Sequence, residues 1–215
     1  MTDATTPTTP TTPTTPTTPT TPTTPSPTSE RAPTAKSPIP AQTRIGHVHL
    51  KVADLERAIW FYHEVLGFDL LANLGTAAFL SAGGYHHHLG LNTWESAGGG
   101  PPARGTTGLY HFAINYPARR DLAVALKRLL DYGWTIDGAS DHTSHEAIYL
   151  HDPDFNGIEL ACDRDPSFWD VMRNPSPERM RASRSPLDFD GLLAELGDEG
   201  AADAAKYLPT LHTFK

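Results

Sequence analysis

The sequence predicts an α+β domain in which two βαβββ modules pair to form a cupped mixed sheet. The order strand, helix and three strands occurs twice, and the two copies keep a nearly constant offset. His47 and His111, near the start of each copy, are 64 residues apart, and Gly67 and Gly133, which follow the predicted helices, are 66 apart. Because each half is too small to be stable alone, the two halves are expected to share one core.

Residues 1–43 are predicted to be a disordered tail. The tripeptide Thr-Thr-Pro is repeated seven times between residues 5 and 25, and 11 of the 20 prolines lie among the first 40 residues. Proline fixes φ and removes a backbone donor, and this segment has no aromatic residue with which to build a core. We expect an extended chain with no part in a functional site.

The first module is predicted to span residues 44–95. Residues 45–52 alternate apolar and polar side chains, which indicates a strand. Asp54 is placed as the N-cap of a helix over residues 55–66, and Gly67 is expected to end it. Three short runs, residues 68–72, 76–81 and 85–94, are separated by glycines and predict three further strands.

The second module is predicted to span residues 108–163, after a Gly/Pro loop over residues 96–105. It is expected to contain strands at 109–114, 134–137, 146–150 and 157–162, and a helix over 120–130. A turn with Pro153 and Asn156-Gly157 should bring Glu159 back beside Tyr149. The domain would then cover residues 44–166, followed by a C-terminal extension, residues 167–215, with a short helix at 190–196.

The charge and cysteine content exclude several classes of protein. A net charge of −8 and a pI near 5.7 argue against general binding to nucleic acid or to an anionic membrane surface. The single cysteine, Cys162, excludes an internal disulfide framework and a cysteine-rich zinc site. There is no apolar stretch of about 20 residues and no start typical of a signal peptide, so a cytoplasmic location is expected.

Histidine is abundant, and two histidines with one glutamate form the leading candidate for a metal site. His47 and His111 lie in the first strand of each predicted module, and Glu159 lies in the last strand of the second. Two imidazoles and one carboxylate with open positions suit non-haem Fe(II). A single strand histidine is usually structural, but the repeat-equivalent positions of His47 and His111 make the combination specific.

Several motifs resemble the vicinal oxygen chelate superfamily, which includes glyoxalase I and the type I extradiol dioxygenases. They are residues 46–55, 61–62, 66–68 and 152–160. Residues 85–94 and 109–114 most resemble the catechol 2,3-dioxygenase branch. The resemblance implies an Fe(II)-dependent oxidoreductase that cleaves a catechol-like substrate with O₂. Because the scaffold also carries other activities, a glyoxalase-type isomerase or lyase and a non-catalytic small-molecule binding or resistance protein remain alternatives.

The resemblance also implies roles for individual residues. His47, His111 and Glu159 match the metal ligands, and Tyr149, ten residues before Glu159, matches a substrate-binding tyrosine. His142 matches a histidine that assists substrate binding, with His145 as the competing candidate.

The proton-handling histidine falls among the three consecutive histidines of the fourth strand. Strand alternation does not settle which one it is: if Leu89 and Leu91 face the covering helix, His88 and His86 face the cleft, whereas direct alignment allows His87. A coordinating His88 would close the metal site and favour Zn(II) or Ni(II), and Mn(II) is a further alternative to Fe(II). The expected partners are the catechol-like substrate and O₂, without nucleic acid or membrane, and homo-oligomerisation is left open.

Overall fold

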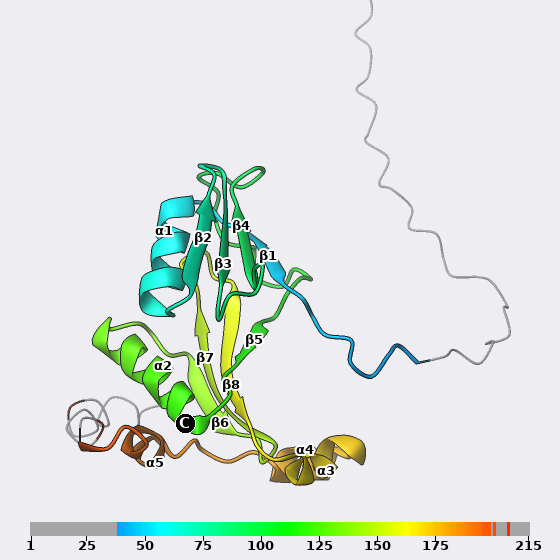
Figure 1. The fold of residues 1–215 in the computed structure, drawn as a ribbon. Helices are drawn as coiled ribbons and strands as arrows, with labels where there is room; N and C mark the ends of the chain where they lie inside the picture. The colour runs from blue at the N-terminus through cyan, green and yellow to red at the C-terminus, as the bar shows by residue number, and fades with distance from the viewer. Residues whose placement is uncertain (1–37, 199, 201–205, 207–215) are drawn as a thin grey trace, which may run out of the picture. The chain divides into compact units, whose positions relative to one another are not determined.

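Two four-stranded mixed sheets with the same topology form the framework of this computed structural model (Figure 1). The strand orders are β1-β4-β3-β2 and β5-β8-β7-β6, so the two predicted βαβββ modules are confirmed. The structure describes residues 38–198, 200 and 206, and most of the predicted tail, residues 1–37, lies outside them. The described residues from Arg44 onward belong to one compact unit.

The first module follows the predicted order of elements. Its sheet comprises β1 (Val48–Lys51), β2 (Asp69–Asn73), β3 (Ala77–Ser81) and β4 (Leu89–Asn92), with β1 parallel to β4. The predicted helix is observed as α1 (Leu55–Trp60) followed by a π-helical turn, η1 (Phe61–Val65). Asp54 caps α1 by accepting a hydrogen bond from the Arg57 amide at 3.0 Å. Gly67 follows the helix with a φ of +87°, which favours glycine.

The second module repeats this arrangement with β5 (Phe112–Asn115), α2 (Arg119–Asp131), β6 (Gly138–Asp141), β7 (His145–His151) and β8 (Gly157–Asp163). β5 is parallel to β8, as β1 is to β4. The strand predicted over residues 134–137 is wrong, because the sheet begins only at Gly138. Trp134 instead packs on Phe61, with ring centroids 4.5 Å apart, and donates its indole N–H to the carbonyl of His151.

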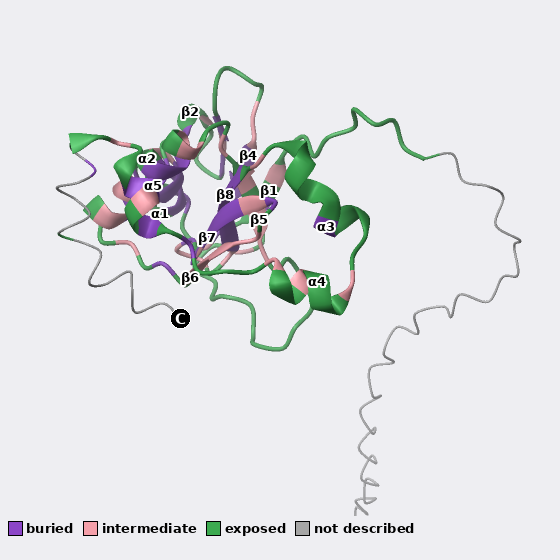
Figure 2. Cartoon of the chain, turned by 90° about the horizontal axis from the view of Figure 1, so that it is seen from below, coloured by how far each residue is buried: buried purple, intermediate pink, exposed green. Residues whose placement is uncertain are grey.

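Both modules share one hydrophobic core, shown in purple in Figure 2. The helical residues Leu122, Leu126 and Leu129 recur at helical spacing on one face of α2 and are fully buried. In the sheets, Leu89 and Leu91 face this core, so the alternating residues of β4 face the opposite, open side. The helices α1 and α2 thus cover one side of the two sheets and leave the other side open.

The turn before β8 joins the two modules. Asp152 accepts a hydrogen bond from the buried Tyr62 hydroxyl at 2.8 Å, and the pKa of Tyr62 is raised by its burial and by this carboxylate. Asp154 accepts hydrogen bonds from the Ala53 amide at 3.1 Å and from Arg57 at 2.6 Å. These contacts fix the strand that carries Glu159 to the loop that follows β1 of the first module.

The C-terminal extension crosses the second sheet from one side to the other. It contains η2 (Pro166–Trp169), α3 (Asp170–Arg173), α4 (Pro177–Ala182) and α5 (Phe189–Ala194), the last of which lies close to the predicted helix. Figures 1 and 2 show α3 and α4 on the side of the sheets opposite α2, and α5 packed beside α2. Among the described residues, no helix has the length and apolarity that crossing a membrane would require.

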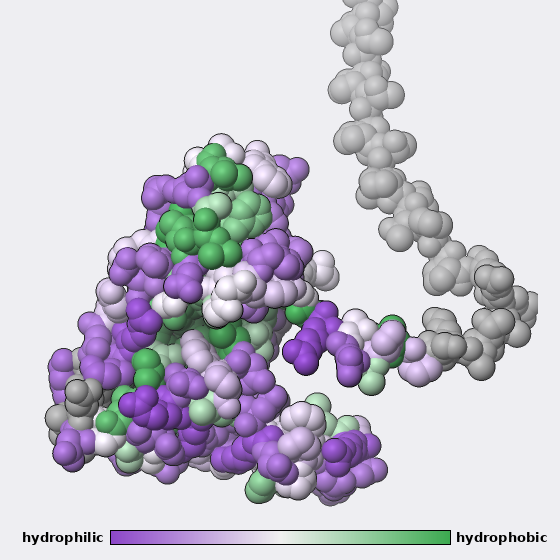
Figure 3. Space-filling view, in the orientation of Figure 1, coloured by the Kyte–Doolittle hydropathy of each residue, from purple (hydrophilic) through white to green (hydrophobic). Residues whose placement is uncertain are grey.

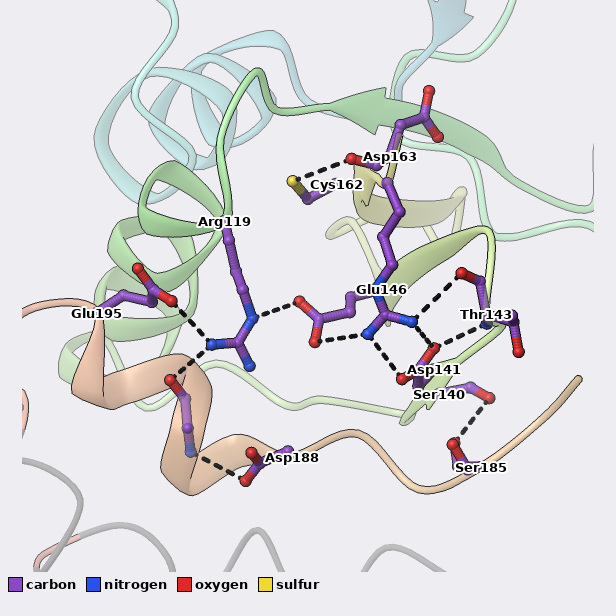
Figure 4. Close-up of polar contacts among 12 residues, drawn as sticks. Arg119, Ser140, Asp141, Thr143, Glu146, Cys162, Asp163, Ser185, Asp188 and Glu195 are labelled. Atoms are coloured by element: carbon purple, nitrogen blue, oxygen red, sulfur yellow. Dashed lines mark hydrogen bonds and ion pairs between the residues drawn. The ribbon is translucent and has the colours of Figure 1, made fainter. Parts of the chain in front are cut away.

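A charged network ties this extension to the second module (Figure 4). The buried Glu146 accepts a hydrogen bond from Arg119 at 2.8 Å, and Arg119 also donates to the Gly191 carbonyl at 2.7 Å. Arg164 binds both carboxylate oxygens of Asp141 at 2.8 Å. Burial would raise the pKa of Asp141, but its hydrogen bonds from Arg164 and from the Thr143 amide outweigh burial and lower that pKa.

Replacing Arg164 by Gln should destabilise the fold by about 2 kcal/mol at pH 7, since hydrogen bonds to charged groups contribute about that much. An aspartate with a lowered pKa stabilises the fold above its unfolded pKa and loses this contribution as the pH falls through its folded pKa. The loss of stability caused by R164Q should therefore shrink below pH 4. Thermal unfolding of the variant and the wild type at pH 7 and pH 3 measures this loss, and R120Q, at an exposed position of α2, is the near-neutral control. A loss of stability that is the same at both pH values would contradict the role of Asp141.

Candidate metal centre and substrate site

The open side of the second sheet carries a cluster of hydrogen-bonded ionisable side chains. His111 Nε2 lies 2.9 Å from Glu159 Oε2, and His145 Nε2 lies 3.1 Å from Glu159 Oε1. The Tyr149 hydroxyl donates to the same carboxylate at 3.4 Å and lies 2.7 Å from His142 Nε2. We call these five residues the glutamate cluster; strand pairing builds it, because Tyr149 lies opposite Glu159 in the β7–β8 register.

The strand period explains which residues enter the glutamate cluster. His145 and Tyr149 are four residues apart on β7, so both point to the open side of the sheet, whereas the intervening Glu146 and Ile148 point toward α2. His111 lies one residue before β5 rather than within it, because the parallel pairing with β8 begins at Phe112. His142 lies in the turn between β6 and β7, and its ring stacks on that of His145 at 4.7 Å.

Burial and mutual charges set the protonation of this cluster. Burial raises the pKa of Glu159, but the hydrogen bond from His145 and the neighbouring imidazoles outweigh it and leave the pKa below its ordinary value. Burial and the nearby Glu159 raise the pKa of Tyr149 to about 12. Burial and the charge of His145 lower the pKa of His142. At neutral pH the cluster therefore holds an ionised carboxylate, a protonated tyrosine hydroxyl and a largely neutral His142.

The first module places a second group of histidines, again at a strand start. His47 lies one residue before β1, and its ring centroid is 4.4 Å from that of His87. His87 Nδ1 lies 2.9 Å from His86 Nδ1. Burial, followed by the charges of His47 and His86, lowers the pKa of His87.

His88 has a different environment from its two neighbours. Its Nδ1 accepts a hydrogen bond from the Ala82 amide at 3.2 Å and lies 3.2 Å from the Ser81 hydroxyl. These contacts tie the ring to the end of β3. Of the three consecutive histidines, His87 lies nearest to His47, and His86 is exposed beside it.

The donor types present suit a divalent metal, but the three proposed ligands are not gathered at one point. His111 and Glu159 are adjacent and supply an imidazole nitrogen and a carboxylate oxygen, which Fe(II) and Zn(II) accept. His47 lies in the first module, where its ring contacts that of His87. Within the part of the chain that the structure describes, no group of three His, Cys, Asp or Glu side chains is arranged so that it could hold a metal ion.

A cavity of about 770 Å³ extends from the glutamate cluster and has the size of a small-molecule site. His111 and Tyr149 line it on one side, and residues of the loop 102–110 line it on another. Phe155, which has a positive φ of +63° and is 66% exposed as a residue, also lines this cavity. A second cavity of about 340 Å³ is mainly apolar and is lined by His47, His88 and the segment 112–117.

An apolar surface marks the first module. Figure 3 shows hydrophobic side chains gathered over β2 and β3. Leu71 on β2 and Leu74 in the turn that follows are about half or more exposed. On the open side of the same sheet, the His49 ring packs against Phe79 and Trp94.

Comparison with known proteins identifies the family. Residues 44–160 match the model of the glyoxalase/bleomycin resistance protein/dioxygenase superfamily, which covers both modules. The chain belongs to this superfamily. The resemblance inferred from the sequence motifs and the α+β fold predicted with it are thereby confirmed.

Three curated superfamily relatives are similar to this chain. The catechol-2,3-dioxygenase of Bacillus subtilis is 43% identical over 157 residues, which cover 73% of this chain and 53% of that protein. Biphenyl-2,3-diol 1,2-dioxygenase 3 of Rhodococcus globerulus is 31% identical over 56% of this chain and 63% of its own length. The glutathione transferase FosA of Serratia marcescens is 30% identical over 54% of this chain and 78% of its own length. The chain thus spans about half to three-fifths of the two dioxygenases that it matches.

Proposed function

We propose that this protein is an Fe(II)-dependent extradiol dioxygenase that cleaves a catecholic ring beside its two hydroxyl groups. The observation that carries the proposal is the glutamate cluster, in which Tyr149 and His142 flank the His111–Glu159 pair. The 43% identity with a protein named catechol-2,3-dioxygenase supports the same reaction. One O₂ is consumed per catechol, both oxygen atoms enter the ring-opened product, and no external reductant is needed.

In this proposal His111 and Glu159, which are adjacent, and His47, which in this structure lies against His87 in the first module, would together hold the metal. Bound Fe(II) would supply the site for the two vicinal oxygens and the activation of O₂. The remaining steps depend on protein groups. Tyr149, whose high pKa keeps its hydroxyl protonated, donates a hydrogen bond to a substrate oxygen. His142, whose pKa is lowered, is neutral at pH 7 and can accept a proton from a diol hydroxyl.

His87 is proposed to handle the proton of the other diol hydroxyl. Its ring contacts that of His47, whereas His88 is bound to the end of β3 through its Nδ1. The cavity of about 770 Å³ beside His111 and Tyr149 provides room for an aromatic ring.

Oxygen uptake tests the proposal. The protein is purified without O₂, its iron content is measured, and a panel of substituted catechols is added under air. We expect oxygen consumption, with one O₂ per catechol, only when both iron and a catechol are present. Full turnover of a hemithioacetal or an epoxide in the absence of O₂ would instead support an isomerase or thiol transferase, the alternative that the similarity to the glutathione transferase FosA favours.

A further inference from the structure

The C-terminal extension passes directly beside the glutamate cluster. Ser185 and Asp141 form an antiparallel bridge with two backbone hydrogen bonds of 2.9 Å, and the Thr143 hydroxyl donates to the Ser183 carbonyl at 3.2 Å. The Ser140 hydroxyl donates to the carbonyl of Ser185 at 3.3 Å, as Figure 4 shows. These contacts hold the extension against the turn between β6 and β7, whose first residue, His142, is hydrogen-bonded to Tyr149.

Arg184 lies between the two serines that are held in this way. The antiparallel bridge between Asp141 and Ser185 and the hydrogen bond between Thr143 and Ser183 place Arg184 opposite His142. The positive charge of Arg184 is in keeping with this placement, because it contributes, after burial, to the pKa shifts of both His142 and Tyr149. The segment that leads to it, α3 and α4, lies on the open side of the sheet, where the glutamate cluster faces (Figures 1 and 2).

The nearby carboxylate that could neutralise Arg184 is already engaged. Asp141, which pairs with Ser185 through its backbone, has both carboxylate oxygens bound by Arg164 at 2.8 Å. Glu146, the next acidic residue of the hairpin, points to the other side of the sheet toward Arg119. Within the described part of the chain, the Arg184 guanidinium forms no hydrogen bond or ion pair, and the residue is exposed.

An arginine without a carboxylate partner, held beside the glutamate cluster, is suited to a carboxylate on the ligand, because the guanidinium matches a carboxylate through two parallel hydrogen bonds. We propose that Arg184 binds an acidic substituent of the substrate, so that the substrates of this protein are catechols bearing a carboxylate side chain. This inference rests on the proposed function and adds to it a substrate class and a specificity-determining residue.

The test compares two substrates and four proteins, the fourth being R184K. The full-length, iron-loaded wild type, R184Q and R181Q are assayed by oxygen uptake with 3,4-dihydroxyphenylacetate and with 4-methylcatechol, which lacks the charge. Arg181 is an exposed arginine at the end of α4, three residues before Arg184, and is the matched control. For R184Q we expect kcat/KM to fall ~10–100-fold with the acidic catechol and less than twofold with the neutral one. R181Q should change neither value, and R184K should restore part of the loss.

The alternative outcomes are distinct. Equal changes of kcat/KM for both substrates in R184Q, or no change for either, would overturn the assignment of Arg184. If the wild type consumes no O₂ with any catechol, the proposed function fails, and anaerobic calorimetric titration of the two catechols into wild type and R184Q decides on Arg184. A selective loss of affinity for the acidic catechol would then support the carboxylate site, whereas equal affinities, or no binding of either catechol, would overturn it.

Discussion

Replacing Glu159 by Gln is expected to lower the metal affinity of the protein by more than ~10²-fold and to abolish most turnover, with little change in stability. Replacing groups that only orient metal ligands typically costs ~10–100-fold in affinity, so loss of an anionic ligand should cost more. Gln has almost the same shape as Glu, so the packing of β8 is kept. Metal content after equilibration with limiting Fe(II), measured with the melting temperature, checks this expectation.

The matched control is Glu146→Gln. Glu146 is also a buried glutamate of the second sheet, but it faces Arg119 and Arg164 on the side away from the glutamate cluster. Loss of its charge leaves two arginines without their shared partner, so E146Q should lose stability and keep its metal. The two variants should thus show opposite patterns. Equal metal content in E159Q and the wild type would contradict the assignment of Glu159.

Replacing His87 by Ala is expected to reduce turnover by ~10²–10⁴-fold at unchanged iron content, which is the usual contribution of a positioned acid or base. The reason is its position against the His47 ring, at the start of β1. His88→Ala is the comparison, because it removes an imidazole bound to Ser81 and Ala82. We expect H88A to lose about 1 kcal/mol of stability and to retain most of its activity.

Iron content and kcat of both variants decide between the histidines. If H88A lost its metal, His88 would be a fourth ligand, and the closed site of a glyoxalase-type enzyme would replace the present proposal. If H87A kept full turnover, the proton-handling role would have to be reassigned.

The repeat of the two modules could be predicted from the sequence because local patterns determine it. The glycines that end the helices, the leucine spacing of α2 and the strand alternation all depend on neighbours a few residues away. The predicted strand at 134–137 failed for a tertiary reason. Trp134 and Ile136 are apolar, and they pack on the helices and the core instead of joining the sheet, which begins at Gly138.

The candidate site was predictable only in part. His111, Glu159 and Tyr149 were identified through motifs, and the structure joins them by hydrogen bonds. His145, considered only as a competitor of His142, contacts Glu159 directly; its spacing of four residues from Tyr149 on one strand was the available signal. Nothing in the local sequence indicated a role for Arg184. It lies near His142 because the extension returns along β6, and that return depends on contacts between residues distant in sequence.

The most direct test of the central claim is the incorporation of ¹⁸O from ¹⁸O₂ into the product formed by the iron-loaded protein from a catechol. The account predicts a ring-opened product that carries both ¹⁸O atoms, and no product in the strict absence of O₂. A product that forms equally without O₂, or that contains no ¹⁸O, would contradict the proposal that this member of the superfamily is an extradiol dioxygenase.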